Sequence, residues 1–292
     1  MGKRKSLLGR LLGWVLGIVL TFVVSIAGVI IFVNKKYGIN LFETYKQVKI
    51  LAKTVDEDKL FTNKFNADDM ASASVTVNAK IDGLITETED GYKISSEGLT
   101  EHSNLTAELL ISDKQMGAIV NNLLTTNGNS FGVDFAGQKA TAEIVQIKFE
   151  NIDELGNADL NIVIKIDISF MQEKLNQFPM SMFKKYVPKM LYISSTTTIT
   201  KTEGKMNYSV ASKTLKINNL DGQQTTDILK ALNIVAPIGS ADELNLTVGQ
   251  QFANVLIGNS ENEGFAYSLK DLGVADYTFK SIDGVGYFVL QP

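Results

Sequence analysis

Apolar and polar residues alternate along several stretches of the chain. In the clearest stretch, Leu160–Ile168, nearly every second residue is aliphatic, and the residues between include Asn161, Lys165 and Asp167. A period of two with one polar side is typical of an antiparallel sheet that is covered on a single face. The same alternation predicts further strands at 73–81, 105–111 and 145–149, and a last strand at 285–290, apolar on both faces, that lies deep.

A long hairpin is predicted over residues 191–217, with its turn at 203–205. Serine and threonine side chains share one side of its first arm and give that side a water-compatible face. In the second arm the apolar residues are even-numbered up to Val210 and odd-numbered from Leu215 onward. Because a β-bulge shifts the alternation by one residue, we expect a bulge or a bend between Ala211 and Thr214.

Four places in the chain combine a Ser, Thr or Asp with a Gln three residues later, shortly after an aliphatic residue. They are Ser112–Gln115, Ser169–Gln172, Asp221–Gln224 and Thr247–Gln250. This is the spacing of a capping box, in which the first side chain and the Gln side chain each bond the other residue's backbone amide. Amphipathic segments follow all four, so the pattern predicts a repeated unit in which a short helix covers the strand before it.

The N-terminal region contains an uninterrupted apolar run, Leu11–Val33, preceded by four basic residues within positions 3–10. As a helix the run is roughly 34 Å long, slightly more than the hydrocarbon core of a bilayer at about 30 Å. We interpret it as an uncleaved transmembrane helix. A signal peptide cleaved near Ser25–Ala27 is the alternative, although the apolar run continues past that point. The basic tail favours a cytoplasmic N-terminus and a single-pass cell-membrane protein with an extracytoplasmic body.

The predicted fold class is α+β: an N-terminal transmembrane helix followed by a β-rich body of long antiparallel strands with short amphipathic helices packed on one face. The predicted divisions are a basic cytoplasmic tail (1–10), the membrane span (11–33), a juxtamembrane helix and linker (34–60), and an extracytoplasmic α+β domain (61–292). Gly13 and Gly17 have the spacing that lets two membrane helices approach closely, which makes a helix–helix dimer a further hypothesis.

Composition removes most catalytic chemistry. The chain has no Cys and one His, His102, which excludes disulfides, a thiol nucleophile, Cys-ligated metals and a His-rich metal site. The G-x-S-x-G spacing at 128–132 follows a predicted helix end and has no later His, so we interpret it as a turn and not as a hydrolase elbow. We expect no enzyme activity, no metal and no cofactor.

Charge argues against one class of partner. Removing the four cations of residues 3–10 from the 28 Lys and Arg leaves 24, against 32 Asp and Glu. An acidic body lacks the basic face that nucleic-acid binding requires, so no nucleic-acid partner is expected. Lys46, Lys49 and Lys53 share one face of the predicted juxtamembrane helix, where they are either solvated or in contact with anionic lipid headgroups.

The junctions at Ser112, Ser169 and Thr247, together with the N-terminal span and the long strands, give the chain a recognisable layout. It resembles bacterial single-pass envelope proteins of the YpmS-like kind and, more loosely, AsmA-like and tubular lipid-binding (TULIP-like) proteins. The resemblance covers layout and extends to no long shared motif. It implies a groove between the sheet and the helices that suits an acyl chain or another apolar ligand.

Methionine and aromatic residues are dense over Phe170–Met190, a composition that suits either core packing or an adaptable binding surface. Under the second interpretation, an apolar groove lies between the sheet and the helices at 112–124 and 169–187. Its candidate ligand-binding residues are Met116, Ile119, Val120, Leu175, Phe178, Met182, Phe183 and Tyr186. The leading functional hypothesis is therefore a non-catalytic protein that binds an apolar or lipid-like ligand at the cell envelope. The alternative is a structural or scaffold subunit of an envelope assembly, which uses the Thr-rich face of the sheet.

Overall fold

The fold was analysed in a computed structural model, which describes residues 41–89, 91–97, 99, 104–125, 131–135, 138–174, 184–233 and 239–292. Within these residues no helix is both long enough and apolar enough to cross a membrane. The predicted fold class is corrected accordingly: what the structure has is an α+β fold of antiparallel sheets and short helices. The predicted span 11–33, with Gly13 and Gly17, lies outside the described residues.

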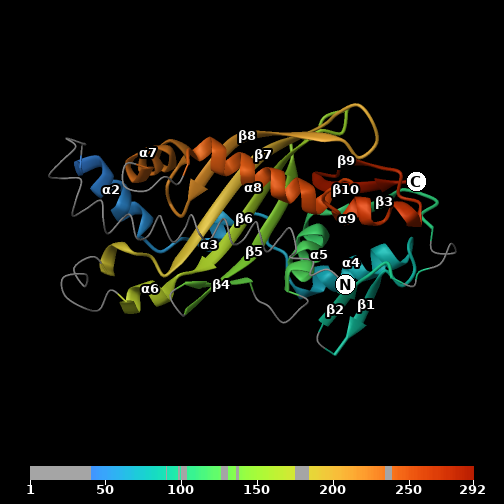
Figure 1. Cartoon of the computed structure of the whole chain (residues 1–292), viewed down its shortest axis with the longest axis horizontal. Coiled ribbons are helices and arrows are strands. Elements are labelled where there is room, and N and C mark those ends of the chain that lie inside the picture. Colours follow the sequence, from blue (N-terminus) through green and yellow to red (C-terminus); the bar gives the residue numbers. More distant parts are fainter. Residues whose placement is uncertain are drawn as a thin grey trace.

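Five antiparallel strands form the main sheet, in the order β4-β5-β6-β7-β8 (Figure 1). Their bounds are β4 Phe131–Phe135, β5 Gln138–Glu150, β6 Ala158–Asp167, β7 Met190–Lys201 and β8 Tyr208–Ile217. The strands predicted at 145–149 and 160–168 and the hairpin at 191–217 are confirmed. The isoleucines of β6 are buried in the core, as their period of two predicted.

Two bulges interrupt this sheet. In β8, Thr214 pairs with Thr196 and Ser212 with Thr197, so Lys213 is the extra residue. This confirms the bulge expected between Ala211 and Thr214. In β5 the register shifts between Ile144 and Gln146, which leaves Val145 as the extra residue. Val145 therefore leaves the main core and joins a second apolar cluster that also holds Phe61.

A second sheet has three strands in the order β3-β10-β9. Strand β3 (Leu109–Ser112) pairs with the C-terminal β10 (Val285–Gln291), which also pairs with β9 (Asp276–Ile282). The strand predicted at 285–290 is thus central in its sheet, with Phe288, Val289 and Leu290 fully buried. The remaining strands, β1 (Ile85–Thr88) and β2 (Gly91–Ile94), form a separate hairpin.

The helices cover the sheets at different places. Figure 1 shows α8 lying across β7 and β8, while α5 packs against β5 and α2 against α7. Their bounds are α2 Leu41–Leu51, α3 Glu57–Leu60, α4 Ala67–Asn78, α5 Asp113–Thr125, α6 Ser169–Lys174, α7 Gly222–Asn233, α8 Ala241–Leu256, α9 Phe265–Ser268 and the 3₁₀ helix η3 Lys270–Leu272. Val48 and Leu51 belong to the same core as the sheet, so the folded body begins before residue 61.

The strand predicted at 73–81 is wrong, because most of this segment belongs to helix α4. Its small and aliphatic residues also fit a helical spacing, since Met70, Ala73 and Val77 face the core whereas Val75 is 74% exposed. Asn66 and Asp69 form a capping box that starts the helix, a signal that the alternation obscured. The strand predicted at 105–111 is also shorter than expected, because β3 begins only at Leu109.

Only two of the four predicted capping boxes form. At Ser112–Gln115 and Asp221–Gln224 both reciprocal hydrogen bonds are present. Thr247 instead lies inside α8, which begins earlier, behind a capping box of Ser240 and Glu243. Gln172 turns its amide to the carbonyl of Val187.

Candidate ligand-binding cleft

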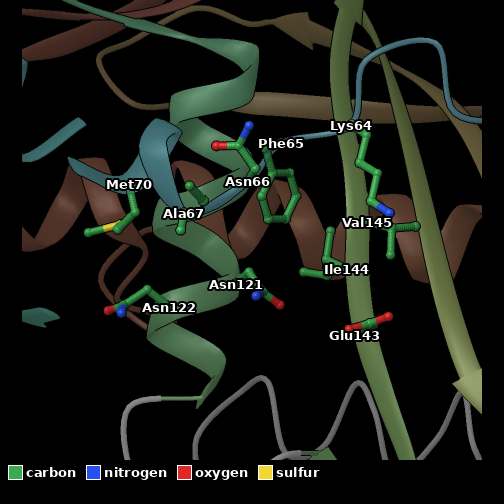
Figure 2. A pocket seen from close by; sticks show the side chains of 11 residues that line it. Lys64, Phe65, Asn66, Ala67, Met70, Asn121, Asn122, Glu143, Ile144 and Val145 are labelled. Carbon is green, nitrogen blue, oxygen red and sulfur yellow. The ribbon is translucent and has the colours of Figure 1, made fainter. Parts of the chain in front are cut away.

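A cleft of about 340 Å³ lies between α4, α5 and β5; we call it the α4/α5 cleft (Figure 2). Its lining comes from three separate stretches of the chain. The lining residues are Lys64, Phe65, Asn66, Ala67, Met70, Ala118, Asn121, Asn122, Glu143, Ile144 and Val145. The cleft adjoins the outer edge of β5, so its wall on that side is a strand, and its other walls are α4, α5 and the segment 64–66 that leads into α4.

The edge of β5 is open where it lines the cleft. Strand β4 pairs with β5 only as far as Ala142. Beyond the bulge, Lys64 forms a bridge with Gln146, and Asn63 bonds both the Gln146 side chain at 2.9 Å and the Ile147 carbonyl at 3.2 Å. Among the strands that the structure describes, none pairs with this edge over residues 143–145, and these three residues line the cleft.

Hydrogen bonds hold the two helical walls in place. The Gln115 side chain at the start of α5 donates to Ser72 Oγ at 3.0 Å and to Thr76 Oγ1 at 2.9 Å, both on α4. At the start of α4, Asn66 accepts hydrogen bonds from the amides of Asp68 and Asp69. The cleft is therefore bounded by elements that are fixed to each other before any ligand binds.

Phe65 closes one end of the cleft because α5 has a glycine opposite it. Figure 2 shows the Phe65 ring between α5 and β5, with Asn121 below it on the side of α5 that faces β5. A Cβ at Gly117 would lie 2.5 Å from Phe65 Cδ1, well inside van der Waals contact. Only glycine at position 117 lets the ring pack this closely against the helix.

The lining divides into apolar and polar halves. Phe65, Met70, Ala118, Ile144 and Val145 supply the apolar contacts. Three carboxamides and two opposite charges supply the polar ones, from Asn66, Asn121, Asn122, Lys64 and Glu143. Carboxamides both donate and accept hydrogen bonds, so they suit a neutral polar group on a ligand.

Charged groups next to the cleft are paired with one another. Glu57 of α3 lies 3.1 Å from Lys165 Nζ and 3.8 Å from Lys64 Nζ, and Lys165 also lies 3.6 Å from Glu143. The hydroxyl of Tyr192 donates to Glu57, and this bond, followed by the Lys165 ammonium, holds the pKa of Glu57 below its usual value. Burial is the main cause that raises the pKa of Tyr192 above its usual range, so the hydroxyl keeps its proton.

The residues predicted to bind a ligand do not line this cleft in the described structure. Met116, Ile119 and Val120 are on α5 as predicted, but their side chains are fully buried in the core. Tyr186 is half-buried against the same core. Leu175, Phe178, Met182 and Phe183 lie outside the described residues. The groove was predicted between the sheet and the helices at 112–124 and 169–187, whereas the α4/α5 cleft is lined by residues 64–70, 118–122 and 143–145 and by none of the residues of 169–187 that the structure describes.

Comparison with known proteins gave no relative: no family model, no curated protein and no solved structure matches the chain. In the described parts of the chain, no group of three or more His, Asp or Glu side chains is arranged to hold a metal ion. His102 is not among the described residues.

Proposed function

We propose that the protein is a non-catalytic binding protein whose α4/α5 cleft takes an apolar or lipid-like ligand. The observation that carries this proposal is the cleft itself, with an apolar wall of Phe65, Met70 and Ile144 beside a polar wall of carboxamides. Its volume of about 340 Å³ falls near the lower end of the range for small-molecule sites, about 300–1,000 Å³. A ligand with an apolar part and a hydrogen-bonding part satisfies both walls.

The polar groups of the cleft support binding and not reaction. Carboxamides do not transfer protons near neutral pH, and the two charged groups, Lys64 and Glu143, are more than half exposed. Catalytic acids and bases are usually found where burial or neighbouring charges shift their pKa strongly. The lining of the cleft has the features of a recognition surface.

Attachment to a membrane through the apolar run 11–33, with an extracytoplasmic body, stays a prediction from the sequence, because those residues lie outside the described structure. The likeness to YpmS-like, AsmA-like and TULIP-like layouts likewise stays a prediction from the sequence. Of its three junctions, only Ser112 caps a helix through its Gln. The proposal therefore rests on the cleft.

The scaffold alternative has no comparable observation in its favour. It depended on a polar, Thr-rich face of the hairpin at 191–217. In the structure the Thr196 hydroxyl accepts a hydrogen bond from Asn161, and the Thr198 hydroxyl donates one to Asp159. These side chains already bond within the sheet.

A matched pair of variants tests the proposal. Ala67 is exposed at the start of α4 and lines the cleft, whereas Ala71 is exposed one turn later and does not. We expect Ala67→Trp to place an indole in the cleft and to weaken the binding of a naturally fluorescent fatty acid at least tenfold in a fluorescence titration. Ala71→Trp should bind as the wild type does. Equal binding by both variants, or no binding by the wild type, would contradict the proposal.

A further inference from the structure

Lys64 and Glu143 are the two ends of one chain of ion pairs, and both ends line the α4/α5 cleft. The chain runs from Lys64 to Glu57 at 3.8 Å, on to Lys165 at 3.1 Å, and on to Glu143 at 3.6 Å. Charges alternate along it. Figure 2 shows Lys64 extending along β5 toward the position of Glu143, with Val145 between them.

The two middle charges are held by the fold. Lys165 on β6 is the direct cross-strand partner of Glu143 on β5. Glu57 also accepts a hydrogen bond from the hydroxyl of Tyr192, a side chain that is itself buried. The side chain of Lys165 is only 24% exposed and that of Glu57 only 35%. The middle of the chain is therefore a satisfied structural ion pair.

The two end charges are more exposed and less tightly paired. The side chains of Lys64 and Glu143 are 57% and 55% exposed, and their single ion pairs, at 3.8 and 3.6 Å, are the longest of the chain. A cation–π contact with Phe61, at 5.9 Å, limits the positions of Lys64. Lys64 forms a β-bridge with Gln146, which lies three residues along β5 from Glu143. The backbones of Lys64 and Glu143 are therefore roughly 10 Å apart. The cleft mouth thus presents one cation and one anion.

We infer that the ligand of the cleft is an amphiphile with a zwitterionic polar group, whose anionic part faces Lys64 and whose ammonium faces Glu143. This inference rests on the proposed function and names the class of ligand. A zwitterion places an anion beside Lys64 and an ammonium beside Glu143, so each end of the chain of ion pairs meets an opposite charge. It adds no net charge to the cleft. A purely anionic amphiphile meets Glu143 with a like charge, and a purely cationic one meets Lys64.

The test compares three short-chain phospholipids below their micelle concentrations by isothermal titration calorimetry: phosphatidylethanolamine and phosphatidylcholine, both zwitterionic, and phosphatidylglycerol, which is anionic. Since exposed ion pairs contribute little each, we expect the wild type to prefer the two zwitterionic lipids about three- to tenfold. Glycerophosphoethanolamine, the same headgroup without acyl chains, should bind far more weakly than the lipid.

Charge-swap variants locate the preference. We expect Lys64→Glu to weaken the binding of both zwitterionic lipids, and Glu143→Lys to shift the preference to phosphatidylglycerol. The double variant Lys64→Gln/Glu143→Gln, which removes both end charges without placing a like charge beside Glu57 or Lys165, should lose the preference and bind all three lipids equally. Lys93→Glu, which makes the same change as Lys64→Glu on the exposed hairpin β2, should leave all three affinities unchanged.

Different results of these titrations test the zwitterionic ligand and the lipid-binding cleft separately. Equal affinity of the wild type for all three lipids, or a double variant that keeps the zwitterion preference, overturns the zwitterion inference while leaving a lipid-binding cleft. Equal affinity for glycerophosphoethanolamine and the lipid overturns the claim that the ligand is an amphiphile. No binding of any lipid overturns the proposed function.

Discussion

Lys213 Nζ lies 2.6 Å from Asp159 Oδ2, because the bulge in β8 turns Lys213 toward the face of the sheet on which Asp159 lies. Asp159 also accepts hydrogen bonds from Asn151 at 2.6 Å and from Thr198 at 2.7 Å. Its side chain is 4% exposed. Burial raises the pKa of Asp159, but the Lys213, Asn151 and Thr198 bonds outweigh it and hold the pKa below its usual value.

Replacing Asp159 should make the protein less stable at neutral pH. A carboxyl whose folded pKa is lowered stabilises the fold above its unfolded pKa, near 3.8, and that contribution is lost as the pH falls through the folded pKa. We expect Asp159→Asn to lower the free energy of unfolding by about 1–3 kcal/mol at pH 7. The difference from the wild type, measured by urea denaturation, should shrink below about pH 4. A constant difference from pH 7 to pH 2 would contradict this account.

The opposite sign is expected at Asp113, the first residue of α5. Its side chain is buried, and this burial raises its pKa, against the opposing effects of Asn63 and the Lys114 amide. A carboxyl with a raised folded pKa destabilises the fold once the pH exceeds its unfolded pKa. Asp113→Asn keeps an acceptor oxygen for the Lys114 amide, which bonds Asp113 at 2.8 Å. We therefore expect a higher melting temperature for this variant at pH 7 and little change near pH 3. A lower melting temperature at pH 7 would show that the charge is stabilising.

Gly249 of α8 is required by the close approach of the helix to β7. A Cβ at this position would lie 2.4 Å from Thr197 Cγ2 and 2.5 Å from its Oγ1. We expect Gly249→Ala to lower the free energy of unfolding by about 1–3 kcal/mol, the usual cost of overpacking. Thr197 is fully buried and its hydroxyl makes no hydrogen bond. Thr197→Ala therefore removes the two atoms nearest to the added Cβ, Cγ2 and Oγ1, without breaking a hydrogen bond. In a double-mutant cycle Thr197→Ala should recover part of the loss, whereas purely additive effects would contradict the contact.

Gly117 of α5 affects both the packing of Phe65 and the binding of a ligand in the cleft. A methyl group there meets the ring of Phe65, which closes one end of the α4/α5 cleft. Because Phe65 is a half-buried side chain and not backbone, it can rotate away at modest cost. We expect Gly117→Ala to reduce binding of the fluorescent fatty acid more than it reduces the melting temperature. A variant that binds like the wild type would show that Phe65 does not shape the site.

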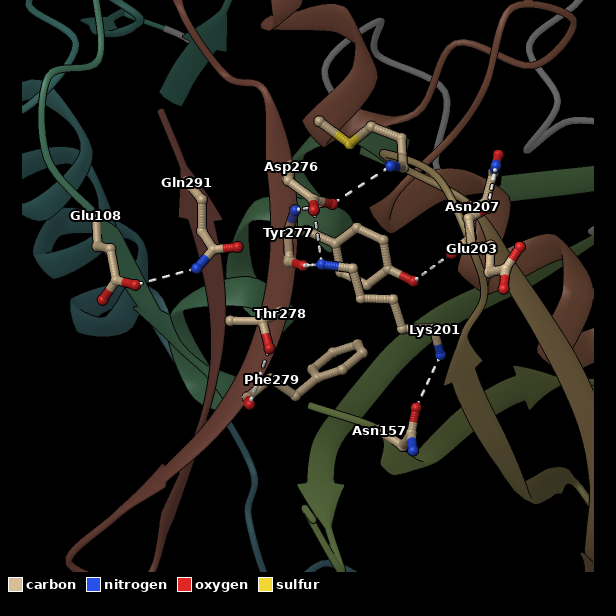
Figure 3. A network of polar contacts seen from close by, with 11 residues as sticks. Glu108, Asn157, Lys201, Glu203, Asn207, Asp276, Tyr277, Thr278, Phe279 and Gln291 are labelled. Carbon is tan, nitrogen blue, oxygen red and sulfur yellow. Dashed lines mark hydrogen bonds and ion pairs between the residues drawn. The ribbon is translucent and has the colours of Figure 1, made fainter. Parts of the chain in front are cut away.

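The polar network where the two sheets meet is structural. Lys201 on β7 pairs with Asp276 on β9 at 2.7 Å and also bonds the Tyr277 carbonyl at 2.9 Å (Figure 3). Behind it, Tyr277, Phe279, Phe288 and Phe149 form an aromatic cluster with ring centroids 5.0–6.4 Å apart. These contacts join the three-stranded sheet to the end of the five-stranded one and keep β5 in position beside the cleft.

The sequence predicted strands well where burial on one face was strict. The isoleucines of β6 and the phase change at Lys213 both reflect local geometry that one strand and its neighbour determine. It failed at α4, where alternating small residues fit two periods and a capping Asn decided between them. The pattern also predicted a helix start at Thr247, whereas the helix starts about two turns earlier, at the capping box of Ser240 and Glu243.

The cleft could be predicted only in outline. The helix that starts at Asp113 was predicted from its capping box, but the wall that α4 supplies was predicted as a strand. The lining of the cleft depends on where residues 61–66 cross the edge of β5, and on the bulge at Val145. The apolar pattern does change phase at this bulge, since the buried residues are even-numbered at Ala142 and Ile144 but odd-numbered at Ile147 and Phe149. Contacts between segments some eighty residues apart depend on tertiary packing, which periodicity does not encode.

Native mass spectrometry of the full chain, purified in a mild detergent and released from it, tests the central claim most directly. We predict a single bound amphiphile on the wild type and on Ala71→Trp, and a bare chain for Ala67→Trp, whose indole occupies the cleft. A wild type that carries no amphiphile, even after incubation with phosphatidylethanolamine, or an Ala67→Trp variant that carries as much as the wild type, would contradict the account.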